Sequence, residues 1–266
     1  MTPPTPSRKA SLPRMAAWLT AALTLTAIAS AAPRTLAQIQ TAGTLRLATE
    51  AAFPPFNFYQ QKALAGFEVD LGNAIGKALN LKVEWVVQPF DGLLIGLNQG
   101  RYDAVMASHA ITPERQKAVD FLNPHYCSTV NIVAKKGGPL TRAALAGKTV
   151  GTQIGTAQIP ILQAIPKIGG VKTFPNDPAV LTALQSGRVD AWSSNGPVVA
   201  YMLKQTGQQK NILIGEIISN ERNAGAVARN NTALRAALNT TLARLMSDGT
   251  YLKISQQWFG QDIRCK

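Results

Sequence analysis

The sequence predicts an α/β protein with two similar lobes, and two observations lead to this class. Short runs of β-branched and apolar residues alternate with helical patterns along most of the chain, which favours mostly parallel sheets flanked by helices. In addition, one helix-to-strand segment recurs: LLIGLNQGRYDAVMAS from Leu93 aligns with VLTALQSGRVDAWSSN from Val180, 87 residues later. The shared Gly-Arg-x-Asp-Ala pattern indicates two lobes of similar build.

The expected elements follow this alternation in chain order. In the first half, strands are expected at 45–49, 83–87 and 103–107, and helices at 67–79 and 91–100. In the second half, strands are expected at 128–134, 148–152, 189–193 and 211–215, and helices at 159–166, 179–187 and 196–207. In each copy of the repeat, a glycine ends the helix and the chain turns into a buried strand.

The ends of the two repeat strands are the expected site. Ligands of open parallel sheets bind at the carboxyl ends of the strands, so residues 108–115 and 193–195 should line a cleft between the lobes. Thr112 and Pro113 form a helix-start signal that places Arg115 in the first turn. The planar, always-charged guanidinium of Arg115 suits a carboxylate at this position.

The first 31 residues read as a signal peptide. Three basic residues precede the apolar run MAAWLTAALTLTAIAS, and Ala29-Ser30-Ala31 has the form of a cleavage site. We therefore expect an exported, periplasmic or extracytoplasmic protein whose mature part is soluble. No cysteine directly follows the apolar run, so a lipid anchor is not expected.

The mature chain remains basic. Residues 1–31 hold three basic residues and no acidic ones, so their removal lowers the formal charge from +13 to +10. The longest basic run is Lys135-Lys136, without interleaved aromatic residues, which argues against nucleic acid as a partner. Cys127 and Cys265 permit one disulfide in an exported chain, and two unpaired thiols with Cys127 buried in a strand are the alternative.

Seven motifs in order carry a family resemblance. They are ATEAAFPPFNF (48–58), GFEVDLGNAIGKAL (66–79), DGLLIGLNQGRYDAV (91–105), ITPERQKAVDF (111–121), GTQIGT (151–156), LQSGRVDA (184–191) and DGTYLKISQQWFG (248–260). From about Thr44 to Gly260 the chain resembles the bacterial extracytoplasmic solute-binding proteins for polar amino acids, the family 3 receptors of ABC importers.

The resemblance implies a Venus-flytrap fold, in which each lobe is a mixed, mostly parallel sheet flanked by helices. Lobe 1 would comprise residues 41–127 and 222–266, and lobe 2 residues 128–221. It implies a monomer without a cofactor or a metal. This monomer would bind a small carboxylate-bearing ligand, most simply a polar or basic amino acid, and deliver it to the membrane subunits of an importer.

The resemblance also assigns roles to ten positions. Arg115 would hold the α-carboxylate, Phe53 and Phe90 would sandwich the side chain, and Glu50 would reach its far end. The complete implied set is Glu50, Phe53, Phe90, Ser108, Ala110, Arg115, Gln153, Thr156, Ala157 and Asn195. His109 should alternate away from the cleft and pack in the interior.

Three of these positions depart from the family pattern. Ala110 and Ala157 replace small polar residues, and Asn195 replaces the aspartate that neutralises the α-ammonium. A neutral amide supplies no counter-charge in a desolvated cleft. Either Glu50 therefore turns to the ammonium, or the ligand is a hydroxy, keto or guanidino acid that has no α-ammonium.

An enzyme is the rival class. The chain contains no H-E-x-x-H, C-x-x-C, G-x-S-x-G or phosphate-loop motif, so metal, nucleophilic and nucleotide chemistry are not expected. Acid/base chemistry remains, as in the few dehydratases that resemble this family. It would need a second cleft carboxylate or a lysine beside Glu50, and the sequence indicates only Glu50.

Overall fold

The computed structural model describes residues 1–3, 5 and 32–265. Except for residues 1–3 and 5, the predicted signal peptide lies outside the described residues. Among the helices of the described part, none is long and apolar enough to cross a membrane.

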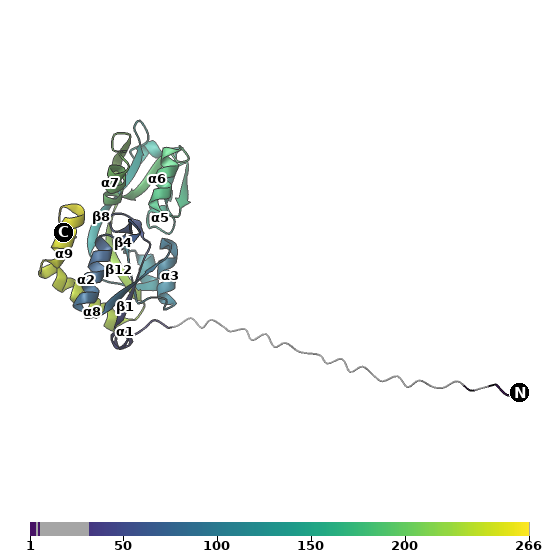
Figure 1. The fold of residues 1–266 in the computed structure, drawn as a ribbon. Coiled ribbons are helices and arrows are strands. Elements are labelled where there is room, and N and C mark those ends of the chain that lie inside the picture. Colours follow the sequence, from purple (N-terminus) through teal and green to yellow (C-terminus); the bar gives the residue numbers. More distant parts are fainter. Residues whose placement is uncertain (4, 6–31, 266) are drawn as a thin grey trace.

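The molecule has two lobes (Figure 1). They share one nine-stranded sheet of order β10-β9-β11-β8-β12-β6-β1-β5, with β7 paired to β12. The first lobe holds β1 (Thr44–Thr49), β5 (Lys82–Val87), β6 (Ala104–Ala110), β7 (Val119–Phe121), α1 (Leu36–Ala42), α2 (Phe67–Ala78), α3 (Leu93–Asn98), α4 (Pro113–Ala118), α8 (Thr232–Ser247) and α9 (Thr250–Phe259). It also holds a small sheet of β2 (Ala52–Phe53), β3 (Asn57–Gln60) and β4 (Ala63–Ala65), and a 3-10 turn at Phe90–Gly92. The second lobe holds β9 (Thr149–Gln153), β10 (Gly170–Phe174), β11 (Ala191–Asn195), α5 (Gln158–Gln163), α6 (Asp177–Gln185), α7 (Gly196–Gln205) and a 3-10 turn at Ala143–Leu145.

Two long strands connect the lobes. β8 (Tyr126–Lys135) and β12 (Ile212–Ala228) pair antiparallel from Ile212 opposite Lys135 to Asn223 opposite Tyr126. β8 then pairs with β11, and β12 pairs with β6, both antiparallel. β7 also pairs antiparallel with β12. The main-sheet pairs that involve neither β8 nor β12, namely β1–β5, β1–β6, β9–β10 and β9–β11, are all parallel, so the expected mixed, mostly parallel α/β class is confirmed. The predicted lobe boundaries, 127/128 and 221/222, fall inside β8 and β12 and remain predictions.

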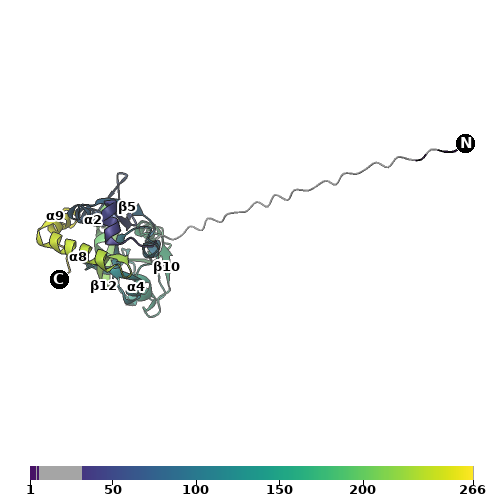
Figure 2. The same cartoon turned by 90° about the horizontal axis from the view of Figure 1, so that it is seen from below.

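Helix α2 shows how the sequence builds the first lobe. Its residues Phe67, Leu71 and Ile75 recur every four positions and are almost fully buried. The ring of Phe67 meets the ring of Tyr251 from α9 edge-on, with centroids 5.5 Å apart. Figure 2 shows α2, α8 and α9 on one side of the molecule, where these helices contact one another. Each such buried side chain contributes about 1.5–3 kcal/mol.

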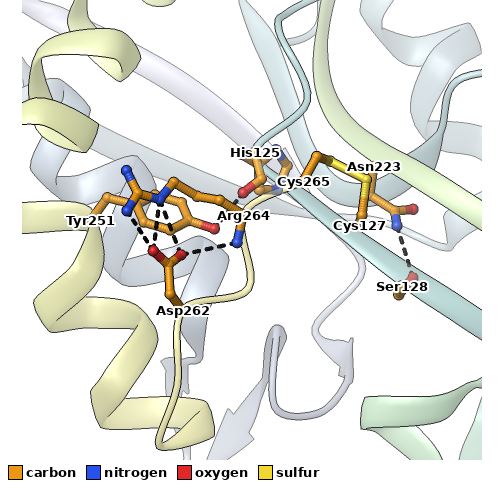
Figure 3. The surroundings of a disulfide bond; sticks show 8 residues. All are labelled: His125, Cys127, Ser128, Asn223, Tyr251, Asp262, Arg264 and Cys265. Carbon is orange, nitrogen blue, oxygen red and sulfur yellow. Dashed lines mark hydrogen bonds and ion pairs between the residues drawn. A yellow bond between two sulfur atoms is a disulfide. The ribbon is translucent and has the colours of Figure 1, made fainter.

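A disulfide joins the C-terminal segment to the start of β8. Cys127 and Cys265 are bonded across 138 residues of sequence, so the alternative of unpaired thiols with Cys127 buried was wrong (Figure 3). Beside the bond, Arg264 pairs with Asp262 and lies 5.7 Å from the ring centroid of Tyr251. The bond therefore anchors the end of the chain next to a strand that connects the lobes.

Candidate ligand-binding site

A cavity lies between the two lobes, and all ten predicted site residues line it. Four further residues that the sequence did not indicate also line it: Thr152, Gln158, Asp177 and Glu221. Residues from opposite lobes hydrogen-bond across it, Arg115 to Gly155 and Gln153 to Glu50.

Arg115 occupies the position that its sequence context predicts. Thr112 caps α4, with its hydroxyl accepting a hydrogen bond from the backbone N–H of Arg115 at 3.2 Å. The guanidinium donates from Nη1 to the carbonyl of Ala110 at 2.8 Å and from Nη2 to the carbonyl of Gly155 at 2.9 Å. Burial lowers the pKa of Arg115 to about 10, and the negative charge of Glu221 opposes this effect. Arg115 therefore stays cationic at neutral pH and contacts both lobes.

Ser108 is held in place by a buried carboxylate. Its φ of 52° lies in the left-handed region, which is uncommon for a residue with a side chain. With this backbone, both its N–H and its hydroxyl donate to Glu68, at 2.7 and 2.8 Å. The side chains of Asn57 and His125 also hydrogen-bond to Glu68, at 2.7 and 2.9 Å. The Ser108 hydroxyl is therefore engaged with the protein interior, and its strand end is fixed by this network.

Glu50 and Asp177 are two acidic groups from opposite lobes. Glu50 follows β1 and accepts a hydrogen bond from the side-chain amide of Gln153 at 2.5 Å. Burial raises the pKa of Glu50 to about 8, opposed by the hydrogen bond from Gln153 and reinforced by the negative charge of Asp177. Asp177 begins α6 and accepts hydrogen bonds from the indole of Trp192 at 2.8 Å and the hydroxyl of Ser194 at 2.6 Å.

Burial also raises the pKa of Asp177, to about 6, while its two hydrogen bonds oppose the rise. Among the groups that shift the pKa values of Glu50 and Asp177, none is a cation. This part of the cavity therefore has two desolvated carboxylates without a positive partner close enough to lower their pKa values.

Asn195 and Glu221 form a second polar pair in the cavity. The side-chain N–H of Asn195 donates to Oε2 of Glu221 at 3.0 Å. The Oδ1 of Asn195 is buried and receives no hydrogen bond from the part of the chain that the structure describes. Burial raises the pKa of Glu221, while the hydrogen bond from Asn195 and the positive charge of Arg115 oppose the rise. The expectation that Glu50 is the single acidic residue of the cleft was therefore wrong, since Asp177 and Glu221 line the same cavity.

The aromatic residues supply the apolar walls. Phe53 and Phe90 are each 7% exposed and come from β2 and the 3-10 turn Phe90–Gly92. The guanidinium carbon of Arg115 lies 5.6 Å from the ring centroid of Phe90. The ring of Phe90 also stacks on that of His109, with centroids 4.3 Å apart. His109 is 2% exposed and does not line the cavity, so its predicted packing role is confirmed.

The second lobe lines the cavity with hydroxyl and amide groups whose bonds are mostly internal. The hydroxyl of Thr156 donates to the carbonyl of Gln153 at 2.8 Å. The hydroxyls of Thr152 and Ser193 both donate to Oε1 of Gln158, at 3.0 and 2.9 Å. Gly155 follows β9 with a φ of 76°, and a Cβ built there would lie 2.9 Å from the Cβ of Asp91 in the first lobe. Only glycine therefore permits this close approach between the lobes.

Asp177 and Glu221, which were not predicted as site residues, differ in how much the sequence indicates their positions. Asp177 follows Asn176 and precedes Pro178, a helix-start signal that could have placed its side chain at a helix N-terminus facing the cleft. Glu221 lies in the polar run SNERN of β12, which has no apolar alternation and was not recognised as a strand. Only the pairing of β12 with β8 brings Glu221 to the cavity.

Comparison with known proteins agrees with this architecture. Residues 45–261 match the family model of the bacterial extracellular solute-binding proteins, family 3. The chain is 33% identical over 224 residues to the ABC transporter arginine-binding protein 1 of Escherichia coli (strain K12), an alignment that covers 82% of this chain and 91% of that protein.

Two solved structures extend the comparison. An ancestral arginine-binding protein, solved with glutamine and with arginine, is 39% identical with a TM-score of 0.78, covering 82% of this chain and 99% of that one. An ancestral amino-acid-binding protein described as a precursor of cyclohexadienyl dehydratase is 32% identical with a TM-score of 0.77, covering 84% of this chain and 98% of that one.

Proposed function

The chain belongs to family 3 of the bacterial extracellular solute-binding proteins, and from this premise we propose that it is the receptor of an ABC importer for an amino acid with a cationic side chain. The observation that carries the proposal is the charge arrangement of the cavity. Arg115 offers a cation to the α-carboxylate, and Glu50 and Asp177 offer two carboxylates that no cation of the described residues neutralises. A guanidinium or ammonium side chain between them would relieve both raised pKa values.

The remaining residues fit such a ligand. The rings of Phe53 and Phe90 would cover the aliphatic stem, and a guanidinium would also stack on an aromatic face. The similar proteins named above include two that bind arginine, which supports L-arginine as the first candidate. The ancestral protein was also solved with glutamine, so a neutral amide side chain belongs in the same test.

Titration calorimetry of the mature protein against the twenty standard amino acids tests this proposal. We expect L-arginine, L-lysine or another basic amino acid to bind most tightly. Tightest binding of L-aspartate or L-glutamate would contradict it, because Glu50 and Asp177 would repel a third carboxylate. Native mass spectrometry of the protein as purified would identify a ligand that is retained from the host cell.

We also propose that the protein acts outside the cytoplasm after cleavage of residues 1–31 and delivers its ligand to the importer's membrane subunits. In this proposal, lobe 1 (residues 41–127 and 222–266) and lobe 2 (residues 128–221) move about β8 and β12. The bonds of Arg115 and Gln153 across the cavity are the contacts that must open. Small-angle scattering should show compaction when L-arginine is added, and an unchanged radius of gyration despite binding would contradict the motion.

One observation favours acid/base catalysis as a second candidate function. The cavity holds three carboxylates, and the pKa values of Glu50 and Asp177, about 8 and about 6, suit proton transfer near neutral pH. The likeness to a precursor of cyclohexadienyl dehydratase points to the same class. Incubation with prephenate or arogenate, followed by ultraviolet detection of an aromatic product, distinguishes the candidates: turnover supports the enzyme, and its absence supports the receptor.

A further inference from the structure

Asn195 lines the cavity, and its side-chain oxygen is a buried hydrogen-bond acceptor without a donor among the described residues. Its side chain is only 3% exposed. The orientation of this amide follows from its neighbour, since an ionised carboxylate can only accept and Glu221 must face the N–H side of the amide. Oδ1 is therefore left pointing away from Glu221. A buried acceptor without a donor is costly, which calls for a donor from a bound molecule.

Glu221 lies on the same face of the sheet as Asn195. Asn195 pairs opposite Val130 on one side of β8, and Glu221 pairs opposite Ser128 on the other side. Val130 and Ser128 are two residues apart, so their side chains and those of their partners project to one face. The hydrogen bond between Asn195 and Glu221 confirms this geometry. Two residues that carry acceptors, Glu221 and Asn195, therefore lie side by side in the cavity wall.

The charges of the cavity are divided into two groups. The pKa of Glu221 responds to Arg115, whereas that of Glu50 responds to Asp177. The Glu221 end thus combines a cation with an anion, and the Glu50 end holds two carboxyl groups, those of Glu50 and Asp177. A cation and an anion at neighbouring positions are the complement of an α-carboxylate and an α-ammonium on one carbon atom.

We infer that Glu221 and Oδ1 of Asn195 form the ammonium subsite, so that the counter-charge absent at position 195 is supplied by β12. The inference rests on the proposed function and goes beyond it, because it requires an α-amino acid and disfavours a hydroxy, keto or guanidino acid. An ammonium has three N–H donors, of which one would bond the Glu221 carboxylate and one the orphaned oxygen of Asn195. Glu50 then remains free for the side chain.

The experiment compares ligands that differ only in the α-ammonium. L-arginine is matched with 5-guanidinopentanoate, and L-lysine with 6-aminohexanoate, each titrated calorimetrically into wild type, Glu221→Gln and Glu216→Gln. Glu216 is the control because it lies on the same strand and its carboxylate pairs with Arg142 at the surface. Thermal melts of all three proteins record whether each variant folds.

We expect wild type to bind each amino acid at least tenfold more tightly than its partner without the ammonium. Glu221→Gln should weaken L-arginine binding by about 10- to 100-fold, or about 1.4 to 2.8 kcal/mol at 1.4 kcal/mol per tenfold. The same variant should change 5-guanidinopentanoate binding by less than threefold, and Glu216→Gln should change neither.

Several outcomes would overturn the inference. Equal losses for both members of a pair in Glu221→Gln would show that Glu221 supports the cavity without contacting the ammonium, and the proposed function would stand. Equal wild-type affinities for the two members of a pair would also overturn the inference and leave the proposed function standing. This comparison uses wild type alone, so it does not depend on whether a variant folds. Wild-type binding of 5-guanidinopentanoate but of no amino acid would overturn both the inference and the amino-acid receptor proposed above, as would binding of none of the twenty amino acids or their analogues.

Discussion

Replacing Glu50 by Gln should stabilise the unliganded protein and weaken its binding of a cationic ligand. Burial raises the pKa of Glu50 from 4.5 to about 8. A carboxyl group whose pKa is higher in the folded state holds more protons when folded, so its contribution to the free energy of unfolding is present below pH 4.5 and is lost as the pH rises through about 8. Glutamine does not titrate, keeps the shape and still hydrogen-bonds Gln153.

The size of the effect follows from the same two pKa values. At about 1.36 kcal/mol for each pKa unit, the rise from 4.5 to about 8 corresponds to about 5 kcal/mol once Glu50 is fully ionised. Between pH 5 and pH 8, the stability of Glu50→Gln relative to wild type should therefore increase by about 3–4 kcal/mol. Opening of the cleft rehydrates Glu50, so this figure applies to the closed state and is the largest expected difference.

Denaturant unfolding of wild type and Glu50→Gln at half-unit intervals from pH 5 to pH 8 measures this difference. Glu114→Gln is the control, because the side chain of Glu114 is 84% exposed and pairs with Lys117 on the surface of α4. A difference between wild type and Glu50→Gln that stays constant across this range would refute the reasoning, since Glu50 would then ionise as it does in water.

The same substitution should act in the opposite direction on binding. A charged hydrogen bond contributes about 1.5–3 kcal/mol, so Glu50→Gln should weaken L-arginine binding by about 10- to 100-fold. A bound cation would lower the pKa of Glu50, and wild type at pH 7 should release up to about one proton per L-arginine. Calorimetry in buffers of different ionisation enthalpy measures this release, which Glu50→Gln should abolish.

Three further substitutions test other parts of the site and fold. Arg115→Ala should fold and should weaken binding of any carboxylate ligand by about 2–5 kcal/mol in calorimetry, whereas a loss of less than threefold would remove Arg115 from the site. Asn195→Asp should weaken amino-acid binding measured at neutral pH, because it replaces a hydrogen-bond donor to Glu221 by a second buried carboxylate; tighter binding would indicate that Glu221 is not the counter-charge. The double variant Cys127→Ser, Cys265→Ser should lower the free energy of unfolding by about 2–5 kcal/mol in denaturant titrations, because the disulfide restricts the unfolded chain. An unchanged unfolding midpoint would show that the disulfide does not stabilise the fold.

Most of the fold was predictable because its strands and helices have regular apolar patterns. Strands at 45–49, 83–87 and 103–107 were expected, and β1, β5 and β6 occupy these positions. The long strand β12 was predicted only at 211–215, because its middle section is polar where it passes the cleft. The small sheet of β2 to β4 and the strand β10 were also missed. Their short or partly exposed strands give no clear alternation.

A site residue was predictable from the sequence where a local motif determines the position of its side chain. The strand-end and helix-start motif around Arg115 placed its guanidinium correctly in the cavity. The charge balance of the cavity was not predictable in this way, because it depends on residues from three separate segments. Asp177 enters from the start of α6 and Glu221 from β12, and no local pattern connects either of them to Glu50.

Position 195 illustrates why this distinction matters for assigning a ligand. Considered alone, an asparagine in place of an aspartate removes a counter-charge and argues against an α-amino acid. In the folded chain, the amide N–H of Asn195 donates to the carboxylate of Glu221 on another strand. The negative charge therefore lies on the residue next to position 195. Because a ligand responds to the total field of the cavity, a charge moved to a neighbouring strand can preserve recognition although the motif is lost. Glu221 is the residue on which this reasoning depends, and its isosteric replacement by glutamine removes the charge while retaining an acceptor for Asn195.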